Sequence, residues 1–325
     1  MTPEDIKKAE QAVMSAVKSR NADKFFILTD STVNSLTYGL FPGVPRLVVE
    51  PGENSKSLEG ATKVWNFLED SGALRRSVLV NIGGGMISDL GGFAASTFKR
   101  GIGCINLPTT LLAAVDAAIG GKTGINFNGL KNEIGTFSLP LAVMPLTSLF
   151  GNLPEEEWLS GVGEVIKTAL LESQELYEMA TSEAFIIERK PEVVEEVVNR
   201  CAAFKQSVVE RDFRESGLRR ILNLGHTAGH AFESLAMARG YHLPHGIAVA
   251  HGLKITLEKS VMEAGLNPGV LNNYLDVLSK FFPPLSLSRD DFNELENFMA
   301  HDKKNSVIGK PEWVLLHAIG EPIFG

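Results

Sequence analysis

The chain has 325 residues, of which 44% are apolar and 22% charged, and its formal net charge is −8. This composition excludes a disordered or fibrous protein and, at roughly 150 residues per domain, predicts about two domains. An acidic chain has no general attraction for DNA or RNA, so we expect no nucleic-acid partner. The only two cysteines, Cys104 and Cys201, exclude a disulfide scaffold and fit a reducing compartment.

The N-terminal segment and the most apolar stretch bear on where the protein acts. Residues 1–20 carry charges throughout, lack the apolar centre of a signal peptide, and form an amphipathic pattern opened by Pro3. The stretch 104–121 contains Pro108, Asp116 and glycines, which make it a poor membrane span. We therefore expect a cytoplasmic protein with no membrane partner.

The pattern of apolar residues divides the chain into two halves. Up to about residue 150, apolar runs typical of buried strands alternate with helical patterns; strands are expected at 24–29, 46–50, 77–82 and 102–107, helices at 57–71 and 86–98. This alternation predicts an α/β fold with a mostly parallel sheet. Later the helical patterns dominate, at 155–172, 191–211, 218–239 and 247–264, with one strand at 313–317. We expect an α/β domain over 1–152 and a mainly α-helical domain over 153–325.

Three glycines, Gly83, Gly84 and Gly85, follow the expected strand 77–82 directly and precede a helix. A backbone without side chains lets a diphosphate approach the helix N-terminus, which offers free N–H groups. Asp89 follows four residues later, so the pattern is GGGxxxD and differs from the common GxGxxG fingerprint. The motif alone fits either a nucleotide site or a tight turn in which Asp89 complements the helix dipole.

Two more polar elements follow expected strands. Glu53 and Lys56 come after the strand at 46–50, and Thr109 and Thr110 come after the strand at 102–107. In open α/β sheets, ligands bind at the carboxyl ends of strands. Each element alone is typical of turn or cap chemistry, but their convergence favours a ligand site.

A cluster of cations stands out in this acidic chain. Lys122 lies between Gly121 and Gly124, and Lys131 precedes Asn132. Lysines beside glycine turns can bind phosphate or carboxylate as point charges. The neighbouring stretches VDAAIG and FNGL are too apolar for a plain exposed loop, which favours an anion site over a solvated loop.

A metal site is indicated by histidine spacing. His226 and His230 are four residues apart, and Glu164 and Lys167 are three apart on an expected helix, so each pair shares a helix face. Two histidines and one carboxylate form a common catalytic zinc set. The pattern alone selects Glu164, His226 and His230, and packing or helix capping is the alternative interpretation.

With these motifs the chain resembles the 3-dehydroquinate synthases of the sugar-phosphate cyclase superfamily. The resemblance begins near residue 30 and rests on GGGMISDLGGF, KRGIGCINLPTTLLAAVDAAIGGKTGIN, LKNEIGTF, LSGVGEVIKTALLE, RRILNLGHTAGHAFE and PHGIAVAHG, in that order. It implies an NAD-binding α/β domain and a helical metal-binding domain with the active site in the cleft between them. It further implies a homodimeric carbon–oxygen lyase of the shikimate pathway that converts 3-deoxy-D-arabino-heptulosonate 7-phosphate, a phosphorylated sugar acid, to 3-dehydroquinate and phosphate.

The resemblance also implies roles for individual residues. It changes the ligands of Zn²⁺ (or Co²⁺) to Glu164, His226 and His245, with His230 facing the substrate phosphate instead. It implies that the substrate is held by Lys122, Lys131, Asn132, Lys167, Arg219, Asn223, His230 and one of Lys303 and Lys304. Arg100 would cross a dimer interface to the neighbouring phosphate. NAD contacts would come from Asp30, Glu53, Lys56, Gly83, Gly84, Gly85, Asp89, Thr109, Thr110, Asp116, Lys122 and Lys131.

Three departures from the family pattern remove no metal ligand and no main phosphate contact, but they leave the substrate identity open. Ile247 stands where the family has glutamate, Thr32 stands where it has asparagine, and 149–154 reads LFGNLP in place of FLKTLP. Another sugar-phosphate cyclase, a metal-dependent alcohol or glycerol dehydrogenase, and a non-catalytic NAD-binding regulator are the alternatives. Retention of Arg219, Asn223 and His230 favours a substrate that carries both carboxylate and phosphate.

Overall fold

Residues 1–300 and 311–324 are described by the computed structural model, in which the chain divides into unit 1, Met1–Leu153, and unit 2, Pro154–Gly325. Lys303 and Lys304, the two predicted substrate contacts near the C-terminus, lie outside the described residues. Within the described ranges, no helix is both long enough and apolar enough to cross a membrane.

Unit 1 alternates strands and helices. Its helices are α1 (Pro3–Ser19), α2 (Ser31–Thr37), α3 (Leu58–Asp70) and α4 (Gly85–Thr97), with short helical turns η1 (Glu53–Ser55), η2 (Phe98–Arg100), η3 (Ala113–Ala117) and η4 (Thr147–Asn152). Its strands are β1 (Phe25–Asp30), β2 (Arg46–Val49), β3 (Val78–Gly83), β4 (Gly103–Pro108), β5 (Lys122–Phe127), β6 (Leu130–Phe137) and β7 (Ala142–Val143).

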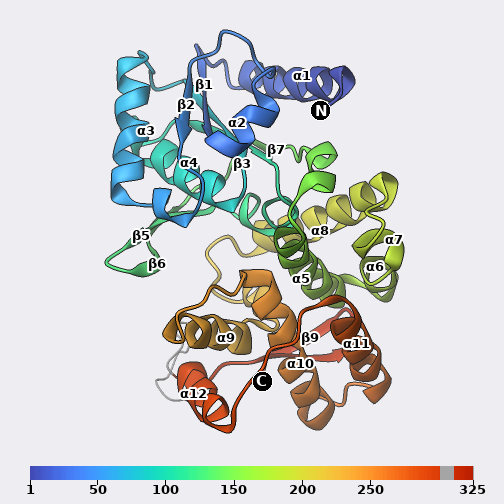
Figure 1. Cartoon of the computed structure of the whole chain (residues 1–325). Helices are drawn as coiled ribbons and strands as arrows, with labels where there is room; N and C mark the ends of the chain where they lie inside the picture. Colours follow the sequence, from blue (N-terminus) through green and yellow to red (C-terminus); the bar gives the residue numbers. More distant parts are fainter. Residues whose placement is uncertain (301–310, 325) are drawn as a thin grey trace. The chain divides into compact units, whose positions relative to one another are not determined.

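The centre of unit 1 is a five-stranded parallel sheet in the order β2-β1-β3-β4-β7 (Figure 1). β1 to β4 lie where the apolar runs predicted strands, so the predicted α/β class with a mostly parallel sheet is confirmed. Because all five strands run in the same direction, the carboxyl ends of β1, β2, β3 and β4 lie together along one edge of the sheet.

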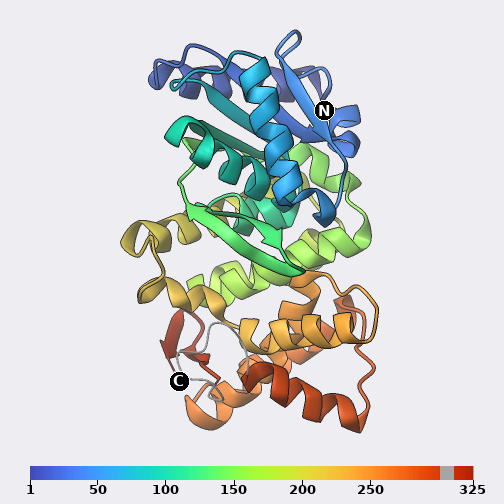
Figure 2. The ribbon, with the colours of Figure 1, turned by 90° about the vertical axis from the view of Figure 1, so that its left-hand side faces the viewer.

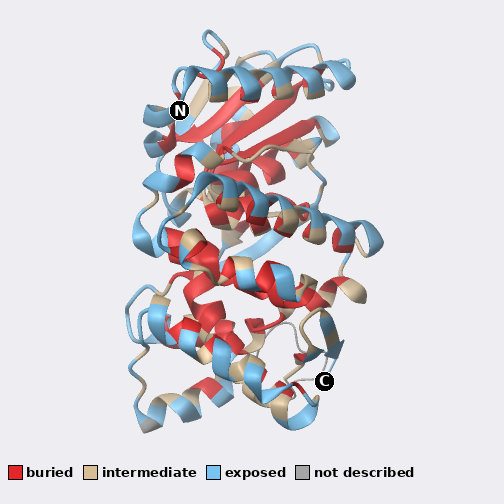
Figure 3. Cartoon of the chain, turned by 90° about the vertical axis from the view of Figure 1, so that its right-hand side faces the viewer, coloured by how far each residue is buried: buried red, intermediate tan, exposed pale blue. Residues whose placement is uncertain are grey.

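Successive side chains of the strands enter two separate apolar cores. Phe26 and Leu28 pack with residues of α3 and α4 on one face, whereas Ile27 packs with residues of α1 on the other. Figure 1 shows α1 and α2 on one side of the sheet and α3 and α4 on the other, and Figure 3 shows how thoroughly the strands are buried. A sheet covered on both faces explains why its strands are apolar throughout.

An antiparallel hairpin of β5 and β6 stands where the sequence predicted glycine turns (Figure 2). Gly124 and Gly135 face each other across the hairpin, and a Cβ on Gly135 would lie 2.3 Å from the carbonyl oxygen of Thr123. Glycines within a strand weaken the apolar signal by which strands are recognised. The prediction of turns here was wrong for that reason.

Unit 2 is mainly α-helical, as predicted (Figure 1). It contains α5 (Glu155–Glu172), α6 (Gln174–Ala180), α7 (Glu183–Ile186), α8 (Pro191–Arg211), η5 (Leu218–Asn223), α9 (His226–Ala238), α10 (His245–Glu263), α11 (Pro268–Phe281) and α12 (Arg289–Ala300), then the hairpin of β8 (Val314–Ala318) and β9 (Glu321–Phe324). α5 and α8 have the predicted bounds, and β8 confirms the late strand.

The prediction of one helix over 218–239 was wrong, because the chain breaks between η5 and α9. Gly225 lies at the break with a φ of 77°, a left-handed conformation that glycine adopts without strain. His226 is therefore the first residue of α9 rather than a residue inside a longer helix.

α10 crosses α5 and α9 so closely that their backbones touch at glycines. A Cβ on Gly163 of α5 would lie 2.0 Å from the carbonyl oxygen of Gly246 in α10, and a Cβ on Gly246 would lie 1.7 Å from that of Ser160. At the second crossing, a Cβ on Gly252 would lie 2.2 Å from the carbonyl oxygen of Gly225, just before α9. No side chain fits at either crossing, so these glycines set the spacing of the three helices.

Replacing Gly163 with Ala tests the crossing of α5 and α10. Alanine favours a helix over glycine by about 1 kcal/mol, but its methyl group would press on a backbone atom, and overpacking costs about 1–3 kcal/mol or more. We expect the steric cost to win and to lower the urea midpoint of unfolding. Gly151→Ala is the control, because a Cβ there meets nothing within 4 Å. An unchanged or raised midpoint in Gly163→Ala contradicts this account of the crossing.

Candidate active site

Several predicted cofactor residues lie at the edge of the unit 1 sheet where the parallel strands end. Asp30 is the last residue of β1, Gly83 is the last of β3, and Thr109 follows β4 directly. Gly83 pairs with Pro108 across the two strands, and the N–H of Thr109 donates to the Gly83 carbonyl at 3.0 Å. The glycine loop and the threonine pair are therefore neighbours in the fold.

The glycine loop leaves the start of α4 without covering side chains. Gly84 is the N-cap residue of α4, so no side chain caps the helix there. A Cβ on Gly84 would lie 3.2 Å from the Thr110 side chain, and one on Gly85 would lie 3.3 Å from the Ala117 side chain. The first N–H groups of a helix have no partner within it, so this loop offers donors to an anion.

Lys56 and Asp89 form an ion pair beside this helix start. Lys56 Nζ donates to Asp89 Oδ2 at 2.6 Å and lies 3.6 Å from Glu53 Oε1, which also accepts from Asn126 Nδ2 at 2.9 Å. Burial raises the pKa of Asp89 to about 6, although the Lys56 ammonium opposes that rise. Asp89 thus has a specific cationic partner beyond any interaction with the helix dipole.

The remaining predicted cofactor residues at this end of the sheet differ in their hydrogen-bond partners. Asp30 accepts from the Val33 N–H at 2.9 Å and caps α2, and Thr110 Oγ1 accepts from the Ala113 N–H at 3.2 Å. By contrast, Thr109 Oγ1 is buried with no hydrogen-bond partner among the described residues. A buried hydroxyl without a partner costs stability, so the orphaned hydroxyl and the glycine cradle both fit a dinucleotide. Asp116 lies in η3, half-buried.

The hairpin carries the cationic cluster of unit 1. Lys122 begins β5, and Lys131 and Asn132 lie on β6; all three are exposed. The apolar flanks argued against a plain exposed loop, and the exposure of these side chains shows that this inference was wrong for them. The apolar signal comes in part from Ile125 of the same hairpin, which is buried in the core with residues of α3 and α4. Arg100 is exposed as well and ends η2 with a φ of 69°.

A buried ion pair lies on α5 in unit 2. Glu164 is 0% exposed and Lys167 is 1% exposed, and Lys167 Nζ donates to Glu164 Oε2 at 2.5 Å. One helical turn separates the two residues, as their sequence spacing predicted. The second carboxylate oxygen, Glu164 Oε1, accepts no hydrogen bond from any described residue.

Two histidines face this orphaned oxygen. Nε2 of His226 lies 3.5 Å from Glu164 Oε1, and Nε2 of His245 lies 3.3 Å from it. Each histidine is the first residue of its helix, α9 or α10, and potential ligand atoms of the three side chains lie within 4.8 Å of one another. The structure therefore brings together the ligand set that the family resemblance implies.

The other ring nitrogen of each histidine has a partner that orients the ring. His226 Nδ1 lies 3.2 Å from the Leu224 carbonyl oxygen, and His245 Nδ1 lies 3.0 Å from Glu233 Oε2. In the neutral ring form that binds a cation, with the proton on Nδ1, each Nε2 presents its lone pair to the space beside Glu164. Sequence reasoning missed Glu233, although it continues the helical spacing of His226 and His230.

The pKa shifts show how strongly these groups interact. Burial raises the pKa of Glu164, but Lys167 and His245 outweigh it and hold the pKa well below its usual range. Burial likewise lowers the pKa of His245, but the carboxylates of Glu164 and Glu233 outweigh it and raise the pKa to about 10. A divalent cation competes with protons for such ligands. One carboxylate and two imidazoles with an orphaned oxygen among them fit zinc or cobalt.

Three predicted phosphate contacts also lie in unit 2. His230 is on α9, with its ring centroid 5.4 Å from that of His226, and it forms a second potential metal group with Glu233 and His245. Arg219 is buried on η5 and donates from Nη1 to the Phe213 carbonyl at 2.7 Å. Asn223 Nδ2, at the end of η5, donates to Glu215 Oε1 at 3.1 Å.

Asp212 holds the loop that carries Arg219. Its carboxylate accepts from the N–H groups of Ser216, Gly217 and Arg219 at 2.9, 2.8 and 2.9 Å. These bonds, chiefly the one from the Arg219 N–H, lower the pKa of Asp212 to about 2. The aspartate therefore stays ionised near neutral pH and keeps the start of η5 in place.

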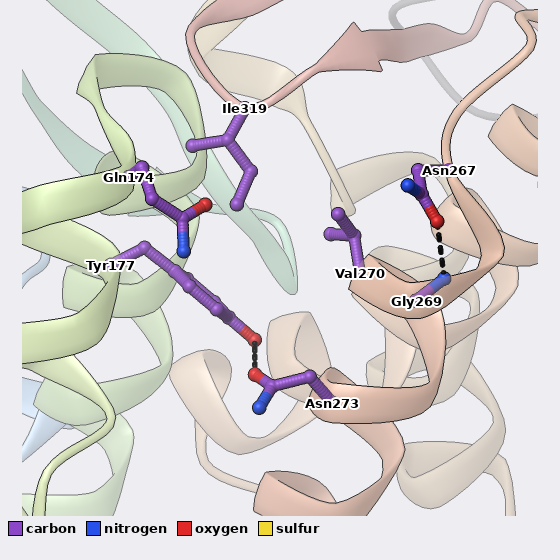
Figure 4. Close-up of a pocket in the computed structure, with 7 residues that line it drawn as sticks. All are labelled: Gln174, Tyr177, Asn267, Gly269, Val270, Asn273 and Ile319. Atoms are coloured by element: carbon purple, nitrogen blue, oxygen red, sulfur yellow. Dashed lines mark hydrogen bonds between the residues drawn. The ribbon is translucent and has the colours of Figure 1, made fainter.

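A separate hollow of about 270 Å³ in unit 2 contains none of the predicted site residues (Figure 4). It is lined by Gln174, Tyr177, Asn267, Gly269, Val270, Asn273 and Ile319. The Tyr177 hydroxyl donates to Asn273 Oδ1 at 2.9 Å, and burial raises the pKa of this tyrosine. Amides and a neutral phenol offer no acid or base at neutral pH and none of the imidazole or carboxylate ligands typical of catalytic zinc, so the chemistry belongs with the buried carboxylate and histidines.

Comparison with known proteins gives family matches along most of the chain. The model described as 3-dehydroquinate synthase N-terminal matches residues 46–160, and the one described as 3-dehydroquinate synthase C-terminal matches residues 161–305. A 3-dehydroquinate synthase from Parabacteroides distasonis is 41% identical over 324 residues, which cover 98% of this chain and 90% of that protein.

Two solved structures are similar over nearly the whole chain. A 2-deoxy-scyllo-inosose synthase complexed with carbaglucose-6-phosphate, NAD⁺ and Co²⁺ has a TM-score of 0.83 and 25% identity, covering 97% of this chain and 89% of that one. A 2-epi-5-epi-valiolone synthase from Streptomyces hygroscopicus subsp. jinggangensis with NAD⁺ and Zn²⁺ bound has a TM-score of 0.80 and 25% identity, covering 94% and 87%.

The raised pKa of Asp89 predicts a pH dependence of stability. Because the folded pKa of about 6 lies above the ordinary value of 3.8, its contribution is present at low pH and is lost as the pH rises through 6. The unfolding free energy of the wild type relative to Asp89→Asn should therefore fall by at most about 3 kcal/mol from about pH 4 to pH 7. Urea unfolding of both proteins across this range measures the difference. A constant or growing difference contradicts the shift.

Proposed function

This chain belongs to the 3-dehydroquinate synthase family, and on that premise we propose that it converts 3-deoxy-D-arabino-heptulosonate 7-phosphate to 3-dehydroquinate and phosphate. It is then a carbon–oxygen lyase of the shikimate pathway. The observation that carries the proposal is the group of Glu164, His226 and His245 around one orphaned carboxylate oxygen.

We assign NAD to the sheet edge of unit 1 and a divalent cation to the buried ligand group of unit 2. The two solved relatives were determined with NAD⁺ and with Co²⁺ or Zn²⁺. When bound, NAD supplies reversible hydride transfer and the cation supplies Lewis-acid stabilisation of a developing alkoxide. Glu164, His226 and His245 hold the cation, while the glycine loop and Thr109 receive the dinucleotide.

The side chains of this protein supply the positive charge that the substrate requires. A carboxylate and a phosphate monoester carry about three negative charges together, whereas the chain has a net charge of −8. We assign this positive charge to five side chains: Lys122 and Lys131 on the hairpin, Lys167 and Arg219 in unit 2, and Lys303 or Lys304. Asn132, Asn223 and His230 add polar contacts to the substrate. Fixed cations of this kind orient the substrate and stabilise the leaving phosphate.

The alternative enzymes are less well supported. A metal-dependent alcohol or glycerol dehydrogenase acts on a neutral polyol, which gives no reason for a dense set of cations. A sister cyclase would share the scaffold, but the family match and the high identity to a 3-dehydroquinate synthase favour that activity. A non-catalytic regulator has no need for a buried carboxylate with two histidines.

Two finer assignments belong to the proposal. A homodimer is suggested by Arg100, which matches a family arginine that would contact the phosphate of the neighbouring subunit. A cytoplasmic location is supported by the two cysteines, which are buried and free.

The overall activity is tested by incubating the protein with the heptulosonate phosphate, NAD⁺ and Zn²⁺. We expect inorganic phosphate and the carbocyclic product to form in equal amounts with no net rise in NADH absorbance. A chelator should abolish phosphate release, and added Zn²⁺ should restore it. Accumulation of NADH without phosphate release would identify a dehydrogenase and contradict the proposal.

Replacing Lys122 with Met tests the assigned role of the hairpin cations. Removing one charge aimed at the phosphate should lower turnover roughly 100-fold or more. Because the side chain is exposed, the urea midpoint should remain near that of the wild type. Lys63→Met is the matched control, since Lys63 is an exposed lysine of unit 1 that pairs with Glu59 on α3. Wild-type turnover in Lys122→Met would remove Lys122 from the site.

A mixed dimer tests the assignment of Arg100. If Arg100 of one subunit serves the phosphate site of the other, a heterodimer of Arg100→Ala and Lys122→Met retains one intact site of two. Such a heterodimer, purified through two different tags, should regain about half of the wild-type activity, although each mutant homodimer is nearly inactive. Absence of recovery would show that Arg100 acts within its own subunit, and a fully active Arg100→Ala homodimer would show that it acts outside the site.

A further inference from the structure

Glu233 lies beside the proposed metal ligands without being one of them. It is on α9, seven residues after His226 and three after His230, so the three side chains form a stripe along one face of the helix. Its Oε2 lies 3.0 Å from His245 Nδ1, and its side chain is 19% exposed. We propose that Glu233 is the positioning residue of His245, an inference that rests on the metal site assigned above.

The two nitrogens of the His245 imidazole ring have different roles. A neutral histidine carries one proton, and a carboxylate facing Nδ1 holds that proton there. When a cation displaces the second proton, Nε2 is left with its lone pair directed to the other side, where the nitrogen lies 3.3 Å from Glu164 Oε1. Glu233 thus selects the tautomer of His245 and the orientation of its ring at the same time.

His226 meets the same requirement in a different way. Its Nδ1 lies 3.2 Å from the Leu224 carbonyl oxygen, a backbone group two residues away in the sequence. Local backbone geometry therefore orients His226, and no side-chain substitution removes that partner. His245 is twelve residues from Glu233, and the contact between them depends on the packing of α10 against α9. A substitution of Glu233 can therefore remove the group that orients the His245 ring.

A direct role for Glu233 as a ligand is the competing interpretation. Potential ligand atoms of His230, Glu233 and His245 also lie within 4.8 Å of one another. This group lacks Glu164, however, whose buried Oε1 would then keep no partner among the described residues. Leaving a buried carboxylate oxygen unsatisfied is costly, so the group that uses Glu164 is favoured. A positioning residue and a ligand respond differently to replacement by glutamine.

The test measures metal affinity of the purified full-length protein by competition with a chromophoric chelator, using Zn²⁺. Glu233→Ala should bind Zn²⁺ about 10–100-fold more weakly than the wild type. Glu233→Gln keeps an oxygen that accepts from Nδ1–H and should recover most of that loss. Glu258→Ala, a half-buried glutamate on α10, serves as the control and should bind like the wild type.

A second readout uses Co²⁺ in place of Zn²⁺. If Glu233 only positions His245, the visible absorption bands of bound Co²⁺ should have the same positions and intensities in Glu233→Gln and the wild type. If Glu233 is a ligand, glutamine should lose as much affinity as alanine and the bands should shift, which overturns the proposal. Wild-type affinity in Glu233→Ala also overturns it. Should Glu233→Ala fail to fold, the affinity and spectrum of Glu233→Gln decide.

The outcomes separate this inference from the proposed function. If the wild type binds no metal, and releases phosphate with or without chelator, then the assigned metal site is wrong. If the wild type binds one metal ion and loses activity with chelator, but Glu233 variants bind normally, then only the positioning role is wrong.

Discussion

The crossing of α10 over α5 and α9 is the constraint on which the proposed metal site depends. His245 directly precedes Gly246, so the contact that brings Gly246 onto α5 also brings His245 onto Glu164. Gly225, which meets α10 at the second crossing, directly precedes His226. Backbone contacts therefore gather three side chains that are remote in sequence, and they do so without any bulky side chain that could shift.

The buried pair of Glu164 and Lys167 indicates a site kept for function. Taking two charges out of water costs several kcal/mol per ion, and their mutual attraction often fails to offset this desolvation penalty. Glu164 and Lys167 are 0% and 1% exposed, so their ion pair contributes little net free energy to the stability of the fold. It makes physical sense as a preformed carboxylate with one oxygen neutralised by lysine and the other left for a cation.

The sequence allowed prediction of features that depend on neighbours along the chain. Buried strands and the helices α5 and α8 follow from apolar periodicity, and the pairing of Glu164 with Lys167 follows from helical spacing. Helical periodicity detects only residues on the same helix, and it therefore selected His230, which shares α9 with His226. His245 reaches the site through a crossing of helices, which no local pattern encodes. The same limit hid Glu233, whose partner is twelve residues away on another helix.

The most direct test of the central claim compares the metal content of two single variants. The account predicts one equivalent of Zn²⁺ in the wild type, near-complete loss in His245→Ala, and retention in His230→Ala, as measured by elemental analysis after dialysis. Loss in His230→Ala together with retention in His245→Ala would contradict it and would return the ligand set to the one that helical spacing alone selects.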